Sequence, residues 1–252
     1  MTLRFCDIEQ NTNDWYEARL GLITGSKFGV VMASTDKKVS AKNAYDDAAV
    51  NYAAQMLELK LITEAQLKKI YKALEKEINL DIDFSATAKD YAFQLATERL
   101  TGAAATKDGY TSKHMRDGHV EESEAKLLFS KKTGLNITNG GFWCDNWVGV
   151  SPDGMTENGV VEVKSHLPHI HFKNIKRGTY DPSYKWQMRG NMHFTGSKEI
   201  TYISYSKLFY GPKRIFSYTL KYEDHEKEID FLLKRIEQFK KLIIEYMSII
   251  EG

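Results

Sequence analysis

The chain has 252 residues, of which 42% are hydrophobic and 27% charged, a composition typical of a globular protein. Its formal net charge of +1 gives no overall attraction to a polyanion, so any nucleic-acid site has to be a local basic surface. Cys6 and Cys144 are too few for a disulfide framework or a four-cysteine iron–sulfur site. No apolar run is long enough to cross a membrane and residues 1–4 lack a signal-peptide core, so we expect a cytoplasmic protein without a membrane partner.

The first half of the chain carries mainly helical patterns. Residues 14–32 predict a helix, a turn and a second short helix with Ser26 near its N-cap. Further helices are expected at 43–60, 63–79, 85–100 and 115–133. We therefore expect one domain over 1–252, in which residues 43–80 form a helical insert or arm.

Strand patterns dominate the second half of the chain. They predict strands at 136–150, 159–165, 199–206 and 214–221, interrupted by a helix that carries Gln187. An amphipathic helix is then expected over 223–250. Its apolar stripe consists of Ile229, Leu232, Leu233, Ile236, Phe239, Ile243 and Tyr246. Two interpretations of this stripe stay open, namely packing of the helix on the protein's own sheet and contact with another subunit.

The most informative segments are Ser-Pro-Asp-Gly at 151–154 and Gly-Val-Val-Glu-Val-Lys at 159–164. The first places Asp153 at a tight turn, and the second predicts a strand on which Glu162 and Lys164 point to one face. An unpaired charge in a buried sheet is costly, and metal coordination would offset that cost. The alternative is an exposed Glu–Lys ion pair on an edge strand, which Asp153 and the upstream segments disfavour.

Four more segments accompany this pair, and their order in the chain is informative. They are Trp-x₃-Arg-x-Gly-x-Ile-Thr-Gly-Ser at 15–26, Leu-Ala-Thr-Glu-Arg-Leu-Thr-Gly at 95–102, Gly-x₃-Glu-x₂-Ala-x₃-Phe at 118–129 and Tyr-x₂-Gln-x₄-Met at 184–192. The ordered set, which runs from about residue 10 to about residue 195, resembles the lambda exonuclease and YqaJ-like viral recombinase family of the PD-(D/E)XK nucleases. The resemblance implies an α/β restriction-endonuclease-like core, a central mixed β-sheet flanked by helices, with helical N- and C-terminal elements.

The acidic residues suit a divalent ion. Asp153 and Glu162 offer the oxygen ligands that Mg²⁺ prefers, and the Val163 carbonyl is a plausible third ligand. A divalent ion activates water and neutralises charge at phosphorus, as phosphodiester hydrolysis requires. The resemblance implies two Mg²⁺ ions, with Mn²⁺ as a substitute, and gives Glu122 the second ion or its waters. Lys164 would hydrogen-bond the attacking water or the scissile phosphate.

The helix around Glu122 and the helix around Gln187 complete the expected site. On a helix, Glu122 shares a small and apolar face with Ala125, whereas Glu121 and Glu124 are expected on the solvated face. The resemblance implies that Gln187 orients the site from the helix that follows the strand. Tyr184, one turn earlier, either packs or contributes to the site.

Arg19 and Ser26 together fit a phosphate pocket. A guanidinium fork and a hydroxyl at a helix N-terminus both favour an anion. The resemblance implies that residues at these positions, together with Ser151, bind a terminal 5′-phosphate. The alternative for Arg19 is a structural ion pair with a nearby acid such as Glu17 or Asp14.

Residues 164–189 are the expected DNA track. The basic residues proposed to contact DNA are Lys173, Lys176, Arg177 and Lys185, interleaved with the aromatic residues Phe172, Tyr180 and Trp186. Three histidines, His166, His169 and His171, lie in the same stretch. No cysteine or further histidine is spaced to complete a tetrahedral zinc site with them.

The function implied by the resemblance is a Mg²⁺-dependent 5′→3′ exonuclease that degrades one strand of linear double-stranded DNA. The resulting 3′ overhangs would serve single-strand annealing recombination, and the substrate would be DNA ends that carry a 5′-phosphate. The resemblance also implies a homotrimeric ring and a single-strand annealing protein as partner. It further implies a phage or prophage origin and action in a bacterial cytoplasm. One alternative is a site- or structure-specific DNA endonuclease on the same metal-dependent core. Another is a non-catalytic DNA-binding module with a structural acidic cluster.

Overall fold

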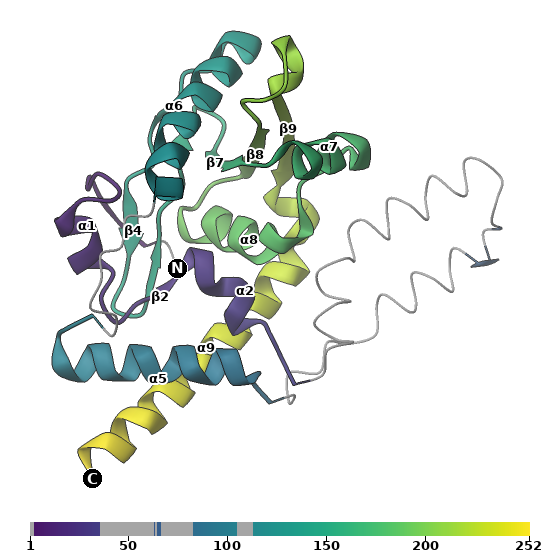
Figure 1. Cartoon of the computed structure of the whole chain (residues 1–252). Helices are drawn as coiled ribbons and strands as arrows, with labels where there is room; N and C mark the ends of the chain where they lie inside the picture. The colour runs from purple at the N-terminus through teal and green to yellow at the C-terminus, as the bar shows by residue number, and fades with distance from the viewer. Residues whose placement is uncertain (1–2, 36–62, 64, 67–82, 105–112) are drawn as a thin grey trace.

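The computed structural model describes residues 3–35, 63, 65–66, 83–104 and 113–252 (Figure 1). The helix predicted at 43–60 lies outside these residues, as does all but three residues of the one at 63–79. One sheet has the order β1 (Arg4–Cys6), β4 (Phe142–Cys144), β5 (Val148–Val150), β2 (Ile23–Thr24). The other has the order β3 (Thr138–Asn139), β6 (Gly154–Met155), β7 (Val160–Ser165), β8 (Glu199–Tyr205), β9 (Ile215–Lys221).

The five-stranded sheet is mixed, because β7 and β8 are parallel and its other pairs are antiparallel. The parallel crossover from β7 to β8 contains α7 (Pro168–Arg177) and α8 (Lys185–Phe194). Helix α8 packs on one face through Met188, while α6 (Lys113–Thr133) packs on the other through Phe129 (Figure 1). A mixed sheet flanked by helices was predicted and is confirmed, although α7 was not predicted.

The single strand predicted over 136–150 is wrong, since this segment forms β3, β4 and β5 in two sheets. Gly141 adopts a φ of 62°, which separates β3 from β4. The side chain of Asp145 then closes the turn before β5, accepting hydrogen bonds from the backbone N–H groups of Trp147 and Val148, each at 2.7 Å.

The N-terminal segment also differs from the helix–turn–helix prediction, because β1 and β2 were not expected. Helix α1 (Asn13–Ala18) is capped by the Thr12 hydroxyl, which accepts from the Trp15 N–H. After β2, a 3₁₀ turn (Gly25–Lys27) leads into the short helix α2 (Phe28–Val31). Ser26 lies exposed in the 3₁₀ turn, one residue before the N-cap of α2.

The C-terminal helix α9 (Glu226–Glu251) packs mainly on other helices. Its residues Leu232, Ile236, Phe239 and Ile243 share a core with α5 (Ala86–Thr101) and α2. Of the stripe, Ile229 and the partly buried Leu233 join the cluster that covers the five-stranded sheet, so packing on the sheet, one of the two interpretations, accounts for only part of the stripe. The faces of that sheet are already covered by α6 and α8, which leaves α9 to bury its stripe elsewhere. None of the helices in the described ranges is long and apolar enough to span a membrane.

Candidate active site

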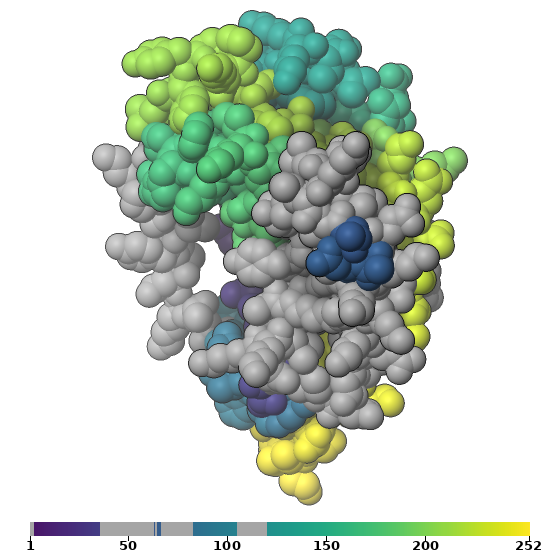
Figure 2. All heavy atoms as spheres, turned by 90° about the vertical axis from the view of Figure 1, so that its right-hand side faces the viewer, coloured from purple at the N-terminus to yellow at the C-terminus, as the bar shows by residue number. Residues whose placement is uncertain are grey.

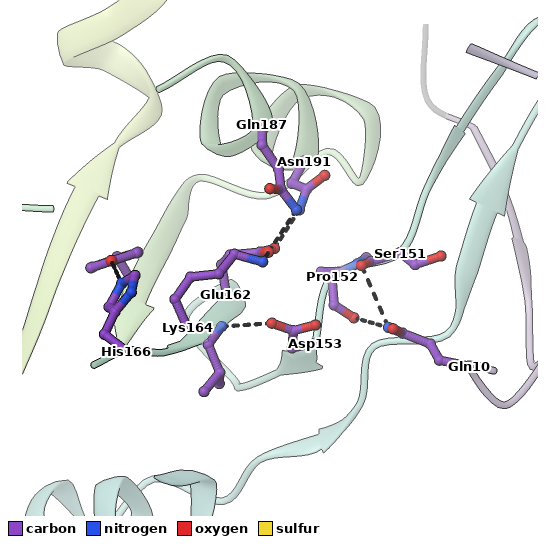
Figure 3. Close-up of polar contacts among 11 residues, drawn as sticks. Gln10, Ser151, Pro152, Asp153, Glu162, Lys164, His166, Gln187 and Asn191 are labelled. Atoms are coloured by element: carbon purple, nitrogen blue, oxygen red, sulfur yellow. Dashed lines mark hydrogen bonds and ion pairs between the residues drawn. The ribbon is translucent and has the colours of Figure 1, made fainter. Parts of the chain in front are cut away.

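Strand β7 presents Glu162 to helix α8. The carboxylate is 1% exposed and pairs through Oε1 with Lys164 Nζ at 2.6 Å. From α8, Gln187 Nε2 donates to Glu162 Oε1 at 2.6 Å and Asn191 Nδ2 donates to Oε2 at 2.8 Å (Figure 3). The predicted orienting role of Gln187 agrees with this contact. Asn191, one helical turn later, holds the second oxygen, so the carboxylate has a fixed orientation.

Asp153 faces the same strand from the preceding turn. Its Oδ2 accepts a hydrogen bond from the backbone N–H of Val163 at 2.6 Å, and its Oδ1 has no hydrogen-bond donor among the described residues. The turn is anchored by Gln10, whose Nε2 donates to the Pro152 carbonyl at 2.9 Å (Figure 3). It also needs glycine opposite, since a Cβ at Gly140 would lie 1.8 Å from the Pro152 carbonyl oxygen.

The electrostatics of this cluster favour a bound cation. Burial raises the pKa of Asp153 well above its usual value, and the nearby Glu162 charge adds to the shift. Burial also raises the pKa of Glu162, although Lys164 opposes that shift. Burial disfavours the Lys164 ammonium, yet the two carboxylates outweigh it and raise its pKa. The buried Glu162 and the half-buried Asp153, whose Oδ1 is open, both resist ionisation and fit the oxygen-ligand chemistry of Mg²⁺.

Glu122 is 27% exposed and pairs with Lys126 at 2.5 Å, one turn along α6. Its charge contributes to the raised pKa of both Asp153 and Glu162, which places it near the cluster. Even so, within the described ranges no three His, Cys, Asp or Glu side chains are close enough to hold one ion. The ligand set of Asp153, Glu162, Val163 and Glu122 therefore stays a prediction.

The neighbours of Glu122 correct one expectation. Glu121 pairs with Lys207 at 2.7 Å and Glu124 pairs with Arg214 at 2.7 Å, so neither is a simple solvated side chain. The reason is that α6 packs against β8 and β9, whose ends supply both cations. These acids attach the helix to the sheet, whereas the Glu122 charge contributes to the raised pKa of Asp153.

Arg19, Trp15 and Ser151 form a linked group next to the Asp153 turn. The Arg19 guanidinium lies 3.8 Å from the centroid of the Trp15 ring, and Trp15 Nε1 donates to Ser151 Oγ at 2.9 Å. Burial lowers the pKa of Arg19 to about 10, which still leaves it charged at neutral pH. The alternative of an ion pair with Asp14 or Glu17 is wrong, since Arg19 forms an ion pair with neither acid and the groups that perturb its pKa are Tyr91 and Tyr16. A half-buried cation without an acidic partner among the described residues suits an external anion.

Ser26 adjoins the same region through Gly25. A Cβ on Gly25 would lie 2.8 Å from Asn191 Oδ1 and 3.2 Å from Val150 Cγ1. Since Asn191 is fixed by its bond to Glu162, the close approach of this turn to α8 requires glycine.

We expect Gly25→Ala to lower turnover by about tenfold with a stability loss of about 1 kcal/mol, because the added methyl displaces Asn191 and loosens Glu162. Turnover of linear DNA and thermal denaturation check both effects. Gly29→Ala is the matched control, since a Cβ there meets no atom within 4 Å. Equal turnover in the two variants would contradict the role of Asn191.

The predicted DNA-contacting residues divide into exposed and buried ones. Lys173 and Lys176 are exposed on α7, which lies at the surface in Figure 2 (green). Arg177 is exposed as well, but its Nη1 donates to Asn174 Oδ1 at 3.1 Å. Lys185 is a correction: it is 2% exposed and pairs with Glu228 at 2.6 Å, so it cannot contact DNA in this structure.

The aromatic residues of this stretch divide in the same way. Tyr180 and Trp186 are buried in the core, whereas Phe172 is 55% exposed. His171 is also buried, with both ring nitrogens engaged, by Ser204 Oγ and the Lys213 carbonyl. Of this set only Phe172 is available to stack on a base.

Gln10 and Asn191 are site residues that sequence reasoning missed. Asn191 follows Gln187 by four positions, and this spacing could have placed both amides on one helix face. Gln10 carries no such signal, because its contact with Pro152 spans 142 positions.

Comparison with known proteins places this geometry in context. Residues 14–198 match the family model of the YqaJ-like viral recombinase domain. A comparison with curated proteins finds no match. Among solved structures, an alkaline exonuclease from Laribacter hongkongensis is similar with 20% identity, a TM-score of 0.67 and coverage of 95% of this chain and 96% of that chain. A phage related exonuclease from Haemophilus somnus is similar with 13% identity, a TM-score of 0.55 and coverage of 91% and 96%. At these identities the likeness confirms the predicted fold.

Proposed function

We propose, from the premise that this chain belongs to the YqaJ-like viral recombinase domain family, that it is a Mg²⁺-dependent 5′→3′ exonuclease on linear double-stranded DNA. The observation that carries the proposal is the group of Asp153, Lys164 and the buried Glu162, whose carboxylate α8 holds through Gln187 and Asn191. The two solved structures of similar fold described above are exonucleases, which supports the same reaction class.

The chain's own residues divide the work of phosphodiester hydrolysis. Asp153, Glu162 and the Val163 carbonyl would hold a divalent ion, with Glu122 near a second one. When bound, the ion lowers the pKa of water and stabilises charge at phosphorus. Lys164 orients the attacking water or the scissile phosphate.

Helix α8 keeps this arrangement in place. Gln187 and Asn191 fix the two Glu162 oxygens, so the carboxylate cannot rotate away from Lys164. Pre-set orientation of this kind lowers the cost of reaching the reactive geometry.

The polarity of degradation would come from the Arg19, Ser26 and Ser151 pocket. A terminal 5′-phosphate carries more charge than an internal phosphodiester, so a cation without an acidic partner favours a strand end. Recessed 5′ ends leave 3′ overhangs, the substrate of a single-strand annealing protein.

We propose that a homotrimeric ring provides processivity. If sedimentation shows a monomer and its processivity is undiminished, this proposal is contradicted.

The test is digestion of linear duplex labelled at the 5′ or the 3′ end, with 5′-phosphate or 5′-hydroxyl termini, with and without Mg²⁺. Immediate release of the 5′ label that requires Mg²⁺ is the expected result. Internal fragments, or cutting of covalently closed circles, identify the endonuclease alternative instead. DNA retention without any Mg²⁺-dependent product identifies a non-catalytic binding module.

We expect Arg19→Ala to remove most of the preference for 5′-phosphate over 5′-hydroxyl ends, about tenfold or more, because a charge-assisted hydrogen bond to the phosphate contributes about 1.5–3 kcal/mol. The ratio of kcat/KM on the two substrates measures it. Arg99→Ala is the matched control, since Arg99 also lies on a tryptophan, Trp147, at 3.9 Å. An equal loss on both substrates for Arg19→Ala refutes the pocket.

A further inference from the structure

His166 extends the row of active-site side chains on β7. Its backbone N–H donates to the Tyr205 carbonyl at 2.8 Å, so the pairing with β8 continues beyond the strand's last residue. Alternation then places His166 on the face of Glu162 and Lys164. The Tyr184 ring is a neighbour of both His166 and Lys164. Its centroid lies 6.1 Å from the centroid of the His166 ring and 5.1 Å from Lys164 Nζ. Figure 3 shows His166 beside Glu162 and Lys164.

A chain of hydrogen bonds connects Arg177 to the His166 ring. Arg177 donates to Asn174 Oδ1, so the Asn174 amide presents its Nδ2 to Tyr202 Oη, at 3.3 Å. The Tyr202 hydroxyl lies 2.7 Å from His166 Nε2 and can give its own proton to that nitrogen. A neutral imidazole that accepts at Nε2 carries its hydrogen on Nδ1.

The remaining ring nitrogen is the chemically useful one. Burial lowers the pKa of His166 to about 4, against the opposing charge of Asp181, so the ring is neutral at pH 7. Nδ1 makes no hydrogen bond with any residue in the described ranges, and the side chain is only half-buried. The ring therefore offers one oriented N–H donor next to Lys164.

We propose that His166 accepts the Tyr202 proton at Nε2 and that its Nδ1–H binds a non-bridging phosphate oxygen of the substrate strand, at the phosphate next to the one that is cleaved. This proposal rests on the proposed nuclease function. An anion is favoured because Lys164 shares the face and because α7 begins two residues later without a capping side chain. The proton arrangement makes His166 a donor only, which suits a phosphate oxygen and excludes a donor group of a base.

The ring proton can be observed without any activity. Long-range ¹H–¹⁵N NMR correlations of the histidine rings should show His166 with its hydrogen on Nδ1. His171 is the internal reference with the opposite form, because its Nε2 faces the Lys213 carbonyl, which can only accept. In Tyr202→Phe the preference of the His166 ring for carrying its hydrogen on Nδ1 rather than on Nε2 should disappear. A hydrogen on Nε2 of His166 in the unaltered protein overturns the proposal.

The contact itself is tested by duplexes that carry one methylphosphonate at successive positions near the 5′ end. Binding is measured without divalent ions, so a failure of the nuclease proposal would not obscure the result. We expect His166→Ala to weaken binding about three- to tenfold, and His166→Asn, whose amide can replace Nδ1–H, to restore part of it. His169→Ala, an exposed histidine on α7, should bind like the unaltered protein.

The decisive result is the combination of both changes. At one phosphate position, the methylphosphonate should weaken DNA binding by the unaltered protein. The same methylphosphonate should weaken binding by His166→Ala to a smaller extent, because this variant has already lost the contact. Equal methylphosphonate losses at every position in the two proteins overturn the proposal. Unchanged binding of natural DNA by His166→Ala overturns it as well.

Discussion

Lys164→Ala should reduce turnover by about 10²- to 10³-fold while the protein stays folded and binds DNA, as expected for loss of one charged donor at the reacting phosphate. A full charge at about 4 Å contributes roughly 4 kcal/mol at an effective dielectric near 20, and the pairing with Glu162 reduces that value. Glu162 keeps Gln187 and Asn191 as hydrogen-bond donors in the variant, so the rest of the site stays assembled.

Single-turnover digestion and DNA binding by fluorescence anisotropy separate chemistry from affinity in this variant. The matched control is Lys89→Ala, which removes a lysine paired with Asp83 at 2.7 Å on the exposed side of α5. The control should keep its turnover. If Lys164→Ala cleaves as fast as Lys89→Ala, the lysine has no part in the reaction; if it loses DNA binding and cleavage together, its role is binding.

Glu228→Gln should produce the largest loss of folding stability, about 3–5 kcal/mol, because it leaves buried cations without their counter-ion. Glu228 pairs with Lys185 at 2.6 Å and with Arg189 at 2.8 Å, and these two side chains are 2% and 0% exposed. The three residues join α8 to α9, so the loss also loosens the helix that positions Gln187. Urea denaturation measures the free energy of unfolding.

The pH dependence of this loss has a definite sign. Burial alone would raise the pKa of Glu228, but the hydrogen bond from His225 and the charges of Arg189 and Lys185 hold it well below its usual value. A lowered folded-state pKa stabilises the protein above the unfolded value of about 4.3, and this stabilisation is lost as the pH falls below it. The difference in the free energy of unfolding between the unaltered protein and Glu228→Gln should therefore become smaller as the pH falls below about 4.3.

The matched control for Glu228→Gln is Glu237→Gln on the same helix. Glu237 pairs with Lys240 at 2.7 Å, but its side chain is 65% exposed. An exposed pair of this kind contributes at most about 1 kcal/mol. Equal losses in the two variants would show that the buried cations do not depend on Glu228.

Local sequence patterns were sufficient to predict the features whose information lies within a few residues. The alternation over 159–164 placed Glu162 and Lys164 on one face of a strand, and the Ser-Pro-Asp-Gly turn located Asp153. The order of the motifs identified the family, and the helices at 85–100 and 115–133 were found because helical periodicity is a short-range signal.

The long-range partners of the side chains could not be predicted in this way and were found in the folded structure. Lys185 lies within a basic stretch of the sequence, but it is buried in the structure, where it pairs with Glu228, 43 positions later. The stripe of α9 is equally apolar whether it covers a sheet or another helix, and the occupied faces of the sheet settled that choice. The contacts of Gln10 with Pro152 and of His166 with Tyr202 span 142 and 36 positions, which no local pattern encodes. Periodicity specifies which face of an element is buried, whereas its partner is selected by packing of the whole chain.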